Sequence, residues 1–336
     1  MIRIGIVSFA HIHAYSYARA LKELEREGLA RLEAVFDDNL ERLRSVSEIY
    51  RPPKVYREFD KLVEDKEIDG VIVASENSRH AEYTIPLLRS GKHVLVEKPI
   101  ATRYRDAVAM ISEARSRGLH LLVAFVMRYH DASREIKRRI RDLGRIYAIT
   151  STNHGKNPMD WFVDPEKAGG GAMMDHIVHA ADLIRWFTEK EFEEAVAFVG
   201  RNIRRDISVE DNAIIMARLS DGAIVSIDCS WSRPPAWPVW GDLYMRIVGE
   251  RGVLVLNAFN QNISVADDKI FKGIYYGPDA DKNMIEAFTK IISGRIDPVE
   301  IGAATGEDGL RALELVLAAY RSWREKRVVR ISEIRE

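Results

Sequence analysis

Three side chains of this sequence, Lys98, Asp175 and His179, could together move a proton and stabilise charge on an oxygen. Asp175 precedes His179 by four residues, so on a helix the two share one face. Histidine titrates near neutral pH, so His179 is a natural base, and Lys98 could stabilise a developing alkoxide. This set suits oxidation of a secondary alcohol, in which a base takes the hydroxyl proton as hydride leaves carbon. Asp175 would orient the imidazole or contact a second hydroxyl.

The first turn of the chain has the layout of a dinucleotide site without its usual glycines. A predicted strand at residues 2–7 leads into a turn and a helix, whose N-terminus could receive a pyrophosphate. Ser8, Ala10 and His13 stand where the three glycines of a G-x-G-x-x-G fingerprint would fall. Small residues at 8 and 10 still permit a tight turn. We expect cofactor contacts along this whole turn: Ser8, Phe9, Ala10, His11, Ile12 and His13.

Two carboxylates follow the second predicted strand. Asp37 could accept hydrogen bonds from the adenosine ribose hydroxyls, and Asp38 would repel a 2′-phosphate, so the sequence favours NAD over NADP. Alternatively, this pair caps the helix that begins near Leu40.

His11-Ile12-His13 also allows a metal-dependent hydrolase, because an H-x-H pair after a first strand can ligate a metal. Such a site needs an eightfold barrel with further histidines and an aspartate at later strand ends. The later strand ends here carry Ser75, Glu97 and Phe125 instead, and we therefore predict no metal.

The pattern of apolar residues divides the chain in two. Five short apolar runs alternate with amphipathic stretches up to residue 125, which predicts an N-terminal doubly wound parallel α/β sheet of the Rossmann type. Later strands alternate polar and apolar residues, with turns at Asp221-Gly222 and residues 250–252, which indicates an α+β domain with a large, mostly antiparallel, open-faced sheet. We expect domains at residues 1–124 and 125–336, with a C-terminal segment that could pack back on the first.

Composition narrows the choice of partners. The 336 residues include 50 basic and 51 acidic side chains, which favours a small uncharged substrate over nucleic acid or a membrane surface. The single Cys229 fits a reducing compartment, and we expect a cytoplasmic protein.

Three segments carry a resemblance to a known family: Ala74 to His80, Glu97-Lys98-Pro99, and Gly169-Gly170-Gly171 followed by Asp175 and His179. With them, and with the segments at residues 209–212 and 227–231, the chain resembles the Gfo/Idh/MocA oxidoreductases, relatives of glucose-fructose oxidoreductase and inositol dehydrogenase, over essentially its whole length. The resemblance implies NAD(P)-dependent hydride transfer to or from a sugar, inositol or related polyol. It implies that Lys98, Asp175 and His179 form the catalytic set and that Pro99 follows a cis bond.

The same resemblance suggests further site residues. Ser75, Asn77 and His80 would line the nicotinamide side, although His80 could simply start a helix, and Glu97 would contact ribose or stabilise its loop. The predicted substrate contacts beyond the catalytic set are Arg128, His154, Trp161 and His176. Trp161 could equally be a core residue.

Members of the family commonly dimerise or tetramerise through an open sheet face, for which Ile214, Met216, Ile224 and Ser226 are candidates here. The missing glycines leave a second functional class open, a non-catalytic relative that binds a dinucleotide or sugar for regulation.

Overall fold

The structure is a computed structural model that describes residues 1–259, 262–266, 269, 271–275, 277 and 279–336. The chain forms two compact units. The first comprises Met1–Tyr129 and Asp279–Leu310, and the second comprises His130–Pro278 and Arg311–Glu336. The predicted domain boundary between residues 124 and 125 stays a proposal for where the nucleotide-binding fold ends.

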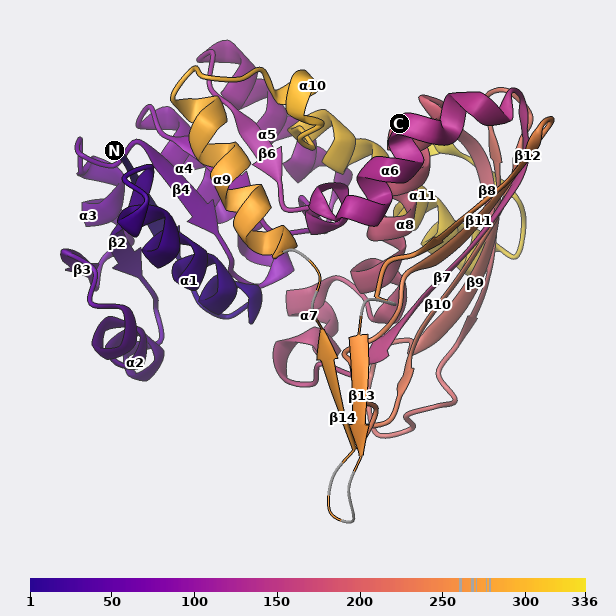
Figure 1. The fold of residues 1–336 in the computed structure, drawn as a ribbon, viewed down its shortest axis with the longest axis horizontal. Helices are drawn as coiled ribbons and strands as arrows, with labels where there is room; N and C mark the ends of the chain where they lie inside the picture. The colour runs from indigo at the N-terminus through magenta and orange to yellow at the C-terminus, as the bar shows by residue number, and fades with distance from the viewer. Residues whose placement is uncertain (260–261, 267–268, 270, 276, 278) are drawn as a thin grey trace. The chain divides into compact units, whose positions relative to one another are not determined.

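A parallel sheet forms the centre of the first unit, all of whose residues are described (Figure 1). Its six strands run in the order β3-β2-β1-β4-β5-β6. They are β1 (Ile2–Val7), β2 (Ala30–Phe36), β3 (Lys54–Tyr56), β4 (Gly70–Val73), β5 (His93–Val96) and β6 (Leu121–Val123). The predicted doubly wound parallel sheet is confirmed, with β3 as an additional short edge strand. Neighbours β1 and β4 lie where the strand order reverses, the place at which such sheets bind ligands.

Helices of the first unit pack on this sheet with buried apolar faces. The longer ones are α1 (His13–Arg26), α2 (Leu40–Tyr50), α4 (His80–Arg89), α5 (Tyr104–Ser116) and α9 (Ala280–Ile292). Shorter ones are α3 (Phe59–Glu64), α10 (Pro298–Ile301), η1 (Asn77–Arg79) and η2 (Val126–Tyr129). Although distant in sequence, α9 packs beside α1 (Figure 1), and buried residues of both helices join one core with β1 and β2.

The second unit is built on a mostly antiparallel sheet. Its described residues form seven strands in the order β12-β11-β7-β10-β9-β8-β15, in which only β7 and β10 pair in parallel. These strands are β7 (Ile146–Lys156), β8 (Phe192–Gly200), β9 (Asn212–Leu219), β10 (Ile224–Arg233), β11 (Tyr244–Gly249), β12 (Gly252–Asn257) and β15 (Val329–Arg330). A separate antiparallel pair consists of β13 (Asn262–Ala266) and β14 (Phe271–Tyr275).

One face of the large sheet is covered by helix and the other is open. The buried helix α8 (Ala172–Thr188) packs on β7 and β10. The remaining helices are α6 (Asp131–Arg139), η3 (Ile140–Leu143), η4 (Asp160–Val163), α7 (Pro165–Ala168), α11 (Gly306–Glu325) and η5 (Ile331–Ile334). Ile214, Met216 and Ile224 are 48%, 41% and 49% exposed, as an apolar open face requires. The predicted open-faced sheet is confirmed.

The structure argues against two alternatives that the sequence left open. The metal-dependent hydrolase required an eightfold barrel, and the open parallel sheet of the first unit is not one. The helix that follows β2 is capped by Asn39, whose side chain accepts the N–H groups of Glu41 and Arg42, so the proposed capping role of Asp37 and Asp38 was wrong. Among the residues that the structure describes, no helix is both long and apolar enough to cross a membrane.

Candidate active site

The end of β5 carries the Glu97-Lys98-Pro99 motif as a buried loop with a cis peptide bond between Lys98 and Pro99. The cis bond is confirmed. The Lys98 backbone N–H donates to Glu97 Oε2 at 3.0 Å. His80, fully buried at the start of α4, places its ring nitrogens 2.8 Å from the Pro99 carbonyl oxygen and 3.3 Å from that of Ser75. The His80 ring therefore ties the end of β4 to the cis-proline loop.

The turn between β1 and α1 is tight despite its missing glycines. Ser8 adopts a left-handed conformation with φ of 66°, a region that glycine occupies more easily. Its Oγ accepts the Ala10 N–H at 3.2 Å. Helix α1 begins after Ile12, whose side chain makes no capping hydrogen bond, and His11 Nδ1 instead accepts the N–H of His13, the first residue of the helix, at 3.2 Å.

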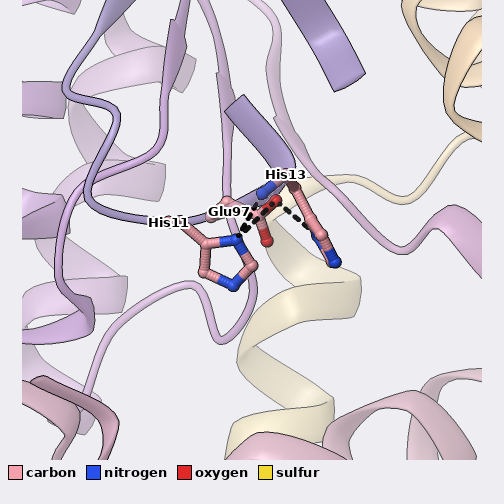
Figure 2. A group of neighbouring side chains, drawn as sticks. All are labelled: His11, His13 and Glu97. Atoms are coloured by element: carbon pink, nitrogen blue, oxygen red, sulfur yellow. Dashed lines mark hydrogen bonds and ion pairs between the residues drawn. The ribbon is translucent and has the colours of Figure 1, made fainter. Parts of the chain in front are cut away.

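His11 and His13, from this turn, both approach the Glu97 carboxylate. His13 Nδ1 lies 3.0 Å from Glu97 Oε1 and His11 Nδ1 lies 3.7 Å from it. Figure 2 shows both rings with these nitrogens directed toward the carboxylate. Tyr17 also donates its O–H to the same oxygen. Burial would raise the pKa of Glu97, but the two histidines and Lys98 outweigh it and hold the pKa well below its usual value.

The two carboxylates after β2 differ in accessibility. Asp37 is fully buried and accepts the Phe9 N–H at 2.7 Å, while Arg42 binds both of its oxygens at 2.7 and 2.8 Å. Asp38 is exposed and pairs with Arg79. Asp37 thus holds the first turn through the Phe9 N–H, and its predicted contact with the ribose stays a prediction, while Asp38 is the more accessible of the two carboxylates.

These features fit a dinucleotide. The switch point of the sheet, the tight turn between β1 and α1 and the accessible Asp38 correspond to the parts that such a cofactor contacts. The departure from the usual arrangement is the His13 side chain, which occupies the place of the third glycine and contacts Glu97.

In the second unit, α8 presents Asp175 in a defined arrangement. The indole Nε1–H of Trp231, on β10, donates to Asp175 Oδ2 at 3.1 Å, and His176 Nε2 lies 3.2 Å from that oxygen. His176 Nδ1 lies 2.7 Å from the Asn153 carbonyl oxygen of β7. Two strands therefore orient the Asp175 carboxylate, and His179 lies one turn further along α8, half-buried.

The start of α8 depends on close backbone approach. A Cβ at Gly171 would lie 2.0 Å from the Glu210 carbonyl oxygen, and one at Gly170 would lie 1.8 Å from the Tyr320 hydroxyl. The Glu210 carboxylate accepts the N–H of Gly171 at 2.8 Å, the N–H of Met173 at 3.1 Å and the O–H of Tyr320 at 2.6 Å. The glycine run is thus required to seat α8 against residues 209–210.

The predicted substrate residues lie in different surroundings. A Cβ at Gly155 would lie 2.8 Å from His176 Cε1, so the neighbouring His154 side chain points to the opposite, open face of the sheet, beside Asp228 and Asp242. This placement does not support a substrate role for His154, which stays a prediction.

Trp161 and Arg128 are both buried. The Trp161 ring stacks on the Phe162 ring, with the two ring centroids 3.8 Å apart. Arg128 pairs with Asp308 at 3.2 Å, within the first unit. Their substrate roles likewise stay predictions.

Sequence reasoning missed three side chains of these sites: Tyr17, Glu210 and Trp231. Glu210 and Trp231 stand in segments that carry the family resemblance, but neither segment says which side chain it would meet. Tyr17 follows His13 by four residues on α1, the spacing that brings it to the same carboxylate.

Comparison with known proteins identifies both halves of the chain. Residues 2–125 match the family model described as an oxidoreductase family with an NAD-binding Rossmann fold, and residues 133–255 match a Gfo/Idh/MocA C-terminal domain. A myo-inositol 2-dehydrogenase of Thermotoga maritima is 28% identical over 346 residues, covering 99% of each chain. A 1,5-anhydro-D-fructose reductase of Ensifer adhaerens is 29% identical over 274 residues, which span 78% of this chain and 80% of that protein.

A solved structure shows the same fold. The crystal structure of a probable dehydrogenase from Thermotoga maritima has a TM-score of 0.82 and 26% identity, covering 99% of this chain and 100% of that one. Together with the two family models, this similarity agrees with the parallel sheet, the open-faced sheet and the glycine-led helix described above. The chain belongs to the Gfo/Idh/MocA family of oxidoreductases, and its first domain is an NAD-binding Rossmann fold.

Proposed function

We propose that this protein transfers hydride between NAD and a secondary hydroxyl or carbonyl of inositol, a related cyclic polyol or a sugar. The observation that carries the proposal is the buried Lys98 at the carboxyl end of β5, combined with the Asp175 and His179 helix. The similarity to a myo-inositol dehydrogenase over 99% of both chains supports this substrate class. The similarity to an anhydrofructose reductase supports chemistry on a ring carbon.

Each catalytic residue has a distinct role in the proposal. His179 accepts the hydroxyl proton in oxidation and returns it in reduction. Lys98 polarises the reacting oxygen through its ammonium charge. Asp175, fixed by Trp231, orients the polar groups at the reacting centre. In the oxidation direction, NAD would accept the hydride.

The cofactor would be held by the first unit. The turn at residues 8–13 would face its pyrophosphate and Asp38 its adenosine ribose, whereas Asn77 would line the nicotinamide side and Glu97 would contact ribose or stabilise its loop. An NADP phosphate would meet the negative charge of Asp38, so NAD is the preferred form.

The test is a panel of inositols, cyclic polyols and sugars incubated with NAD and purified protein, with nicotinamide reduction followed by absorbance. We expect turnover with at least one member. Lys98→Ala and His179→Ala should each lower kcat by about 10²–10⁴-fold, the range for a lost proton-transfer or charge-stabilising group.

Matched controls separate this loss from damage to the fold. Lys61, exposed on α3, pairs only loosely with Glu64 at 3.3 Å, so Lys61→Ala should keep full activity. His120→Ala is the corresponding control for His179→Ala and should also keep full activity. Tight NAD binding without turnover over the whole panel would instead support the non-catalytic alternative, and unchanged kcat in both active-site variants would refute the proposed residue roles.

A further inference from the structure

The turn after β1 and the end of β5 bring three metal-binding groups together. The Nδ1 atoms of His11 and His13 and the Oε1 atom of Glu97 all lie within 4.8 Å of one another (Figure 2). Glu97 and His11 are buried, while the His13 side chain is 35% exposed and leaves the group accessible from solvent. Although the sequence alone predicted no metal, from these positions we propose that the first unit binds a divalent transition-metal ion through His11, His13 and Glu97.

The distances between the donor atoms suit this role. Metal bonds to histidine nitrogen and carboxylate oxygen are about 2.0–2.2 Å long, which places neighbouring donors of a tetrahedral site roughly 3.3–3.6 Å apart. The nitrogens of His13 and His11 stand 3.0 and 3.7 Å from Glu97 Oε1. Both nitrogens are therefore close to the tetrahedral spacing from the carboxylate oxygen, and all three donor atoms lie within 4.8 Å of one another.

The protonation of His11 also suits a ligand. Its Nδ1 accepts the backbone N–H of His13 at 3.2 Å, so this nitrogen carries no proton, and a bound metal would replace that N–H as the partner of its lone pair. A metal ligand must be deprotonated in this way. The nearby Glu97 oxygen is a second acceptor, and a cation between them would bind both.

Surrounding groups hold the carboxylate in place. Tyr17 donates its O–H to Glu97 Oε1, and the Lys98 N–H donates to Oε2 at 3.0 Å. Partners of this kind orient metal ligands and raise metal affinity. The ligand set comes from the turn between β1 and α1 and from the residue after β5, and the contacts of Glu97 with His13 and Tyr17 hold it in place without a metal.

The ligand types select the metal. Two imidazoles and one carboxylate favour Zn²⁺, Co²⁺ or Fe²⁺ over Mg²⁺ and Ca²⁺, which prefer oxygen ligands. Three protein ligands leave a coordination position open for water or another oxygen donor. A cation here would supply positive charge at a turn that lacks the glycine fingerprint of other dinucleotide sites. The binding site itself does not depend on the proposed dehydrogenase activity.

Cobalt titration of chelator-treated protein, without nicotinamide, tests the proposal. We expect one equivalent of Co²⁺ to bind, with visible absorption bands that Zn²⁺ abolishes by displacement. His13→Ala and Glu97→Gln should each weaken binding by about 10²-fold or more, since each removes a ligand. His13 is partly exposed, so His13→Ala should fold normally, and the melting temperature of each variant checks this.

His120→Ala is the matched control. His120 lies in the same unit and stacks on His93 with ring centroids 5.1 Å apart, outside the proposed site. This variant should bind Co²⁺ like the unaltered protein. The proposal is overturned if the unaltered protein binds no Co²⁺ at micromolar concentrations, or if a folded His13→Ala variant binds it equally well.

Discussion

Trp231 contacts the carboxylate of Asp175, one of the proposed catalytic residues of the second unit. Its indole N–H reaches Asp175 Oδ2 at 3.1 Å, and both side chains are buried. A hydrogen bond to a charged group in such surroundings contributes roughly 1.5–3 kcal/mol. Trp231 is therefore a positioning residue for Asp175.

Trp231→Phe keeps an aromatic ring but removes the N–H donor. We expect kcat to fall by about tenfold, because one charged-group hydrogen bond is lost, with a smaller change in KM. Steady-state kinetics on the active polyol would measure both constants. Trp323→Phe, at a tryptophan that is 44% exposed, should leave them unchanged. Equal kcat in the two variants would remove Trp231 from the positioning role.

His154 gives the open sheet face a charge that depends on pH. Its ring nitrogens lie 3.1 Å from Asp228 and 3.4 Å from Asp242, and Arg233 also binds Asp242. The hydrogen bond to Asp242 raises the pKa of His154, burial lowers it, and Asp228 raises it further, for a net increase. Because the folded-state pKa is raised, this stabilisation is complete below the unfolded pKa and is lost as pH rises through the folded one.

His154→Asn should therefore destabilise the protein more in acid than in base. We expect the free energy of unfolding to fall by about 1 kcal/mol below about pH 6, and by less near pH 9. Thermal melts across this range would show the difference. His120, whose pKa is lowered by burial, is the opposite control, since His120→Asn should lose less stability than the unaltered protein on acidification. A pH-independent effect of His154→Asn would contradict this account.

At the residue scale, the sequence predicted which residues belong to the candidate sites better than it predicted which side chains contact one another. Residue type and motif singled out Lys98, Asp175 and His179, whose catalytic roles stay a prediction. The contact between His13 and Glu97 was not, because 84 residues separate them and their proximity depends on how β1, β4 and β5 pair. The buried position of Asp37 was hidden for the same reason, since its partners Phe9 and Arg42 come from different elements.

The position of helix α8 depends on contacts made by its first residues. Its N-terminus is held by the Glu210 carboxylate, and Gly171 fits without a side chain against the Glu210 backbone and the Val209 side chain. Burial raises the pKa of Glu210, while the N–H donors and Tyr320 lower it, for a net increase. This arrangement sets where Asp175 and His179 lie along the sheet.

Gly171→Ala should displace α8, because its Cβ would lie 2.0 Å from the Glu210 carbonyl oxygen. We expect a loss of about 3 kcal/mol or more in stability, seen as a melting temperature several degrees lower. Gly5→Ala is the matched control, since its Cβ would find its nearest neighbours at 3.6 Å. It should change stability by less than about 1 kcal/mol. Similar melting temperatures for the two variants would contradict the close packing at Gly171.

The elements themselves were largely predictable. Apolar runs bounded by glycines and polar turns marked β1, β2, β4, β5 and β6, because a central parallel strand must be apolar on both faces. β3 was missed because Lys54–Tyr56 is an edge strand of three residues, too short to show a period. The helix cap at Asn39 was missed because adjacent Asp37 and Asp38 are equally good capping residue types.

For the whole molecule, the two units carry different parts of the proposed function. The first holds the Rossmann sheet, and the second holds α8, with the proposed catalytic residues Asp175 and His179, and an apolar open sheet face. That face, with Ile214, Met216 and Ile224 exposed, keeps a homodimer or homotetramer as our prediction. Residue patterns give neither the number of subunits in this oligomer nor the identity of the substrate, because both depend on surface shape.

Direct observation of hydride transfer tests the central claim most sharply. The protein would be incubated with NAD and an inositol or sugar deuterated at its ring carbons, and the nicotinamide product analysed by mass spectrometry. The account predicts one deuterium transferred to each nicotinamide reduced by the unaltered protein, at a rate at least about 10²-fold lower with Lys98→Ala or His179→Ala. Reduction of NAD without deuterium transfer, or no transfer from any member of the panel, would contradict it.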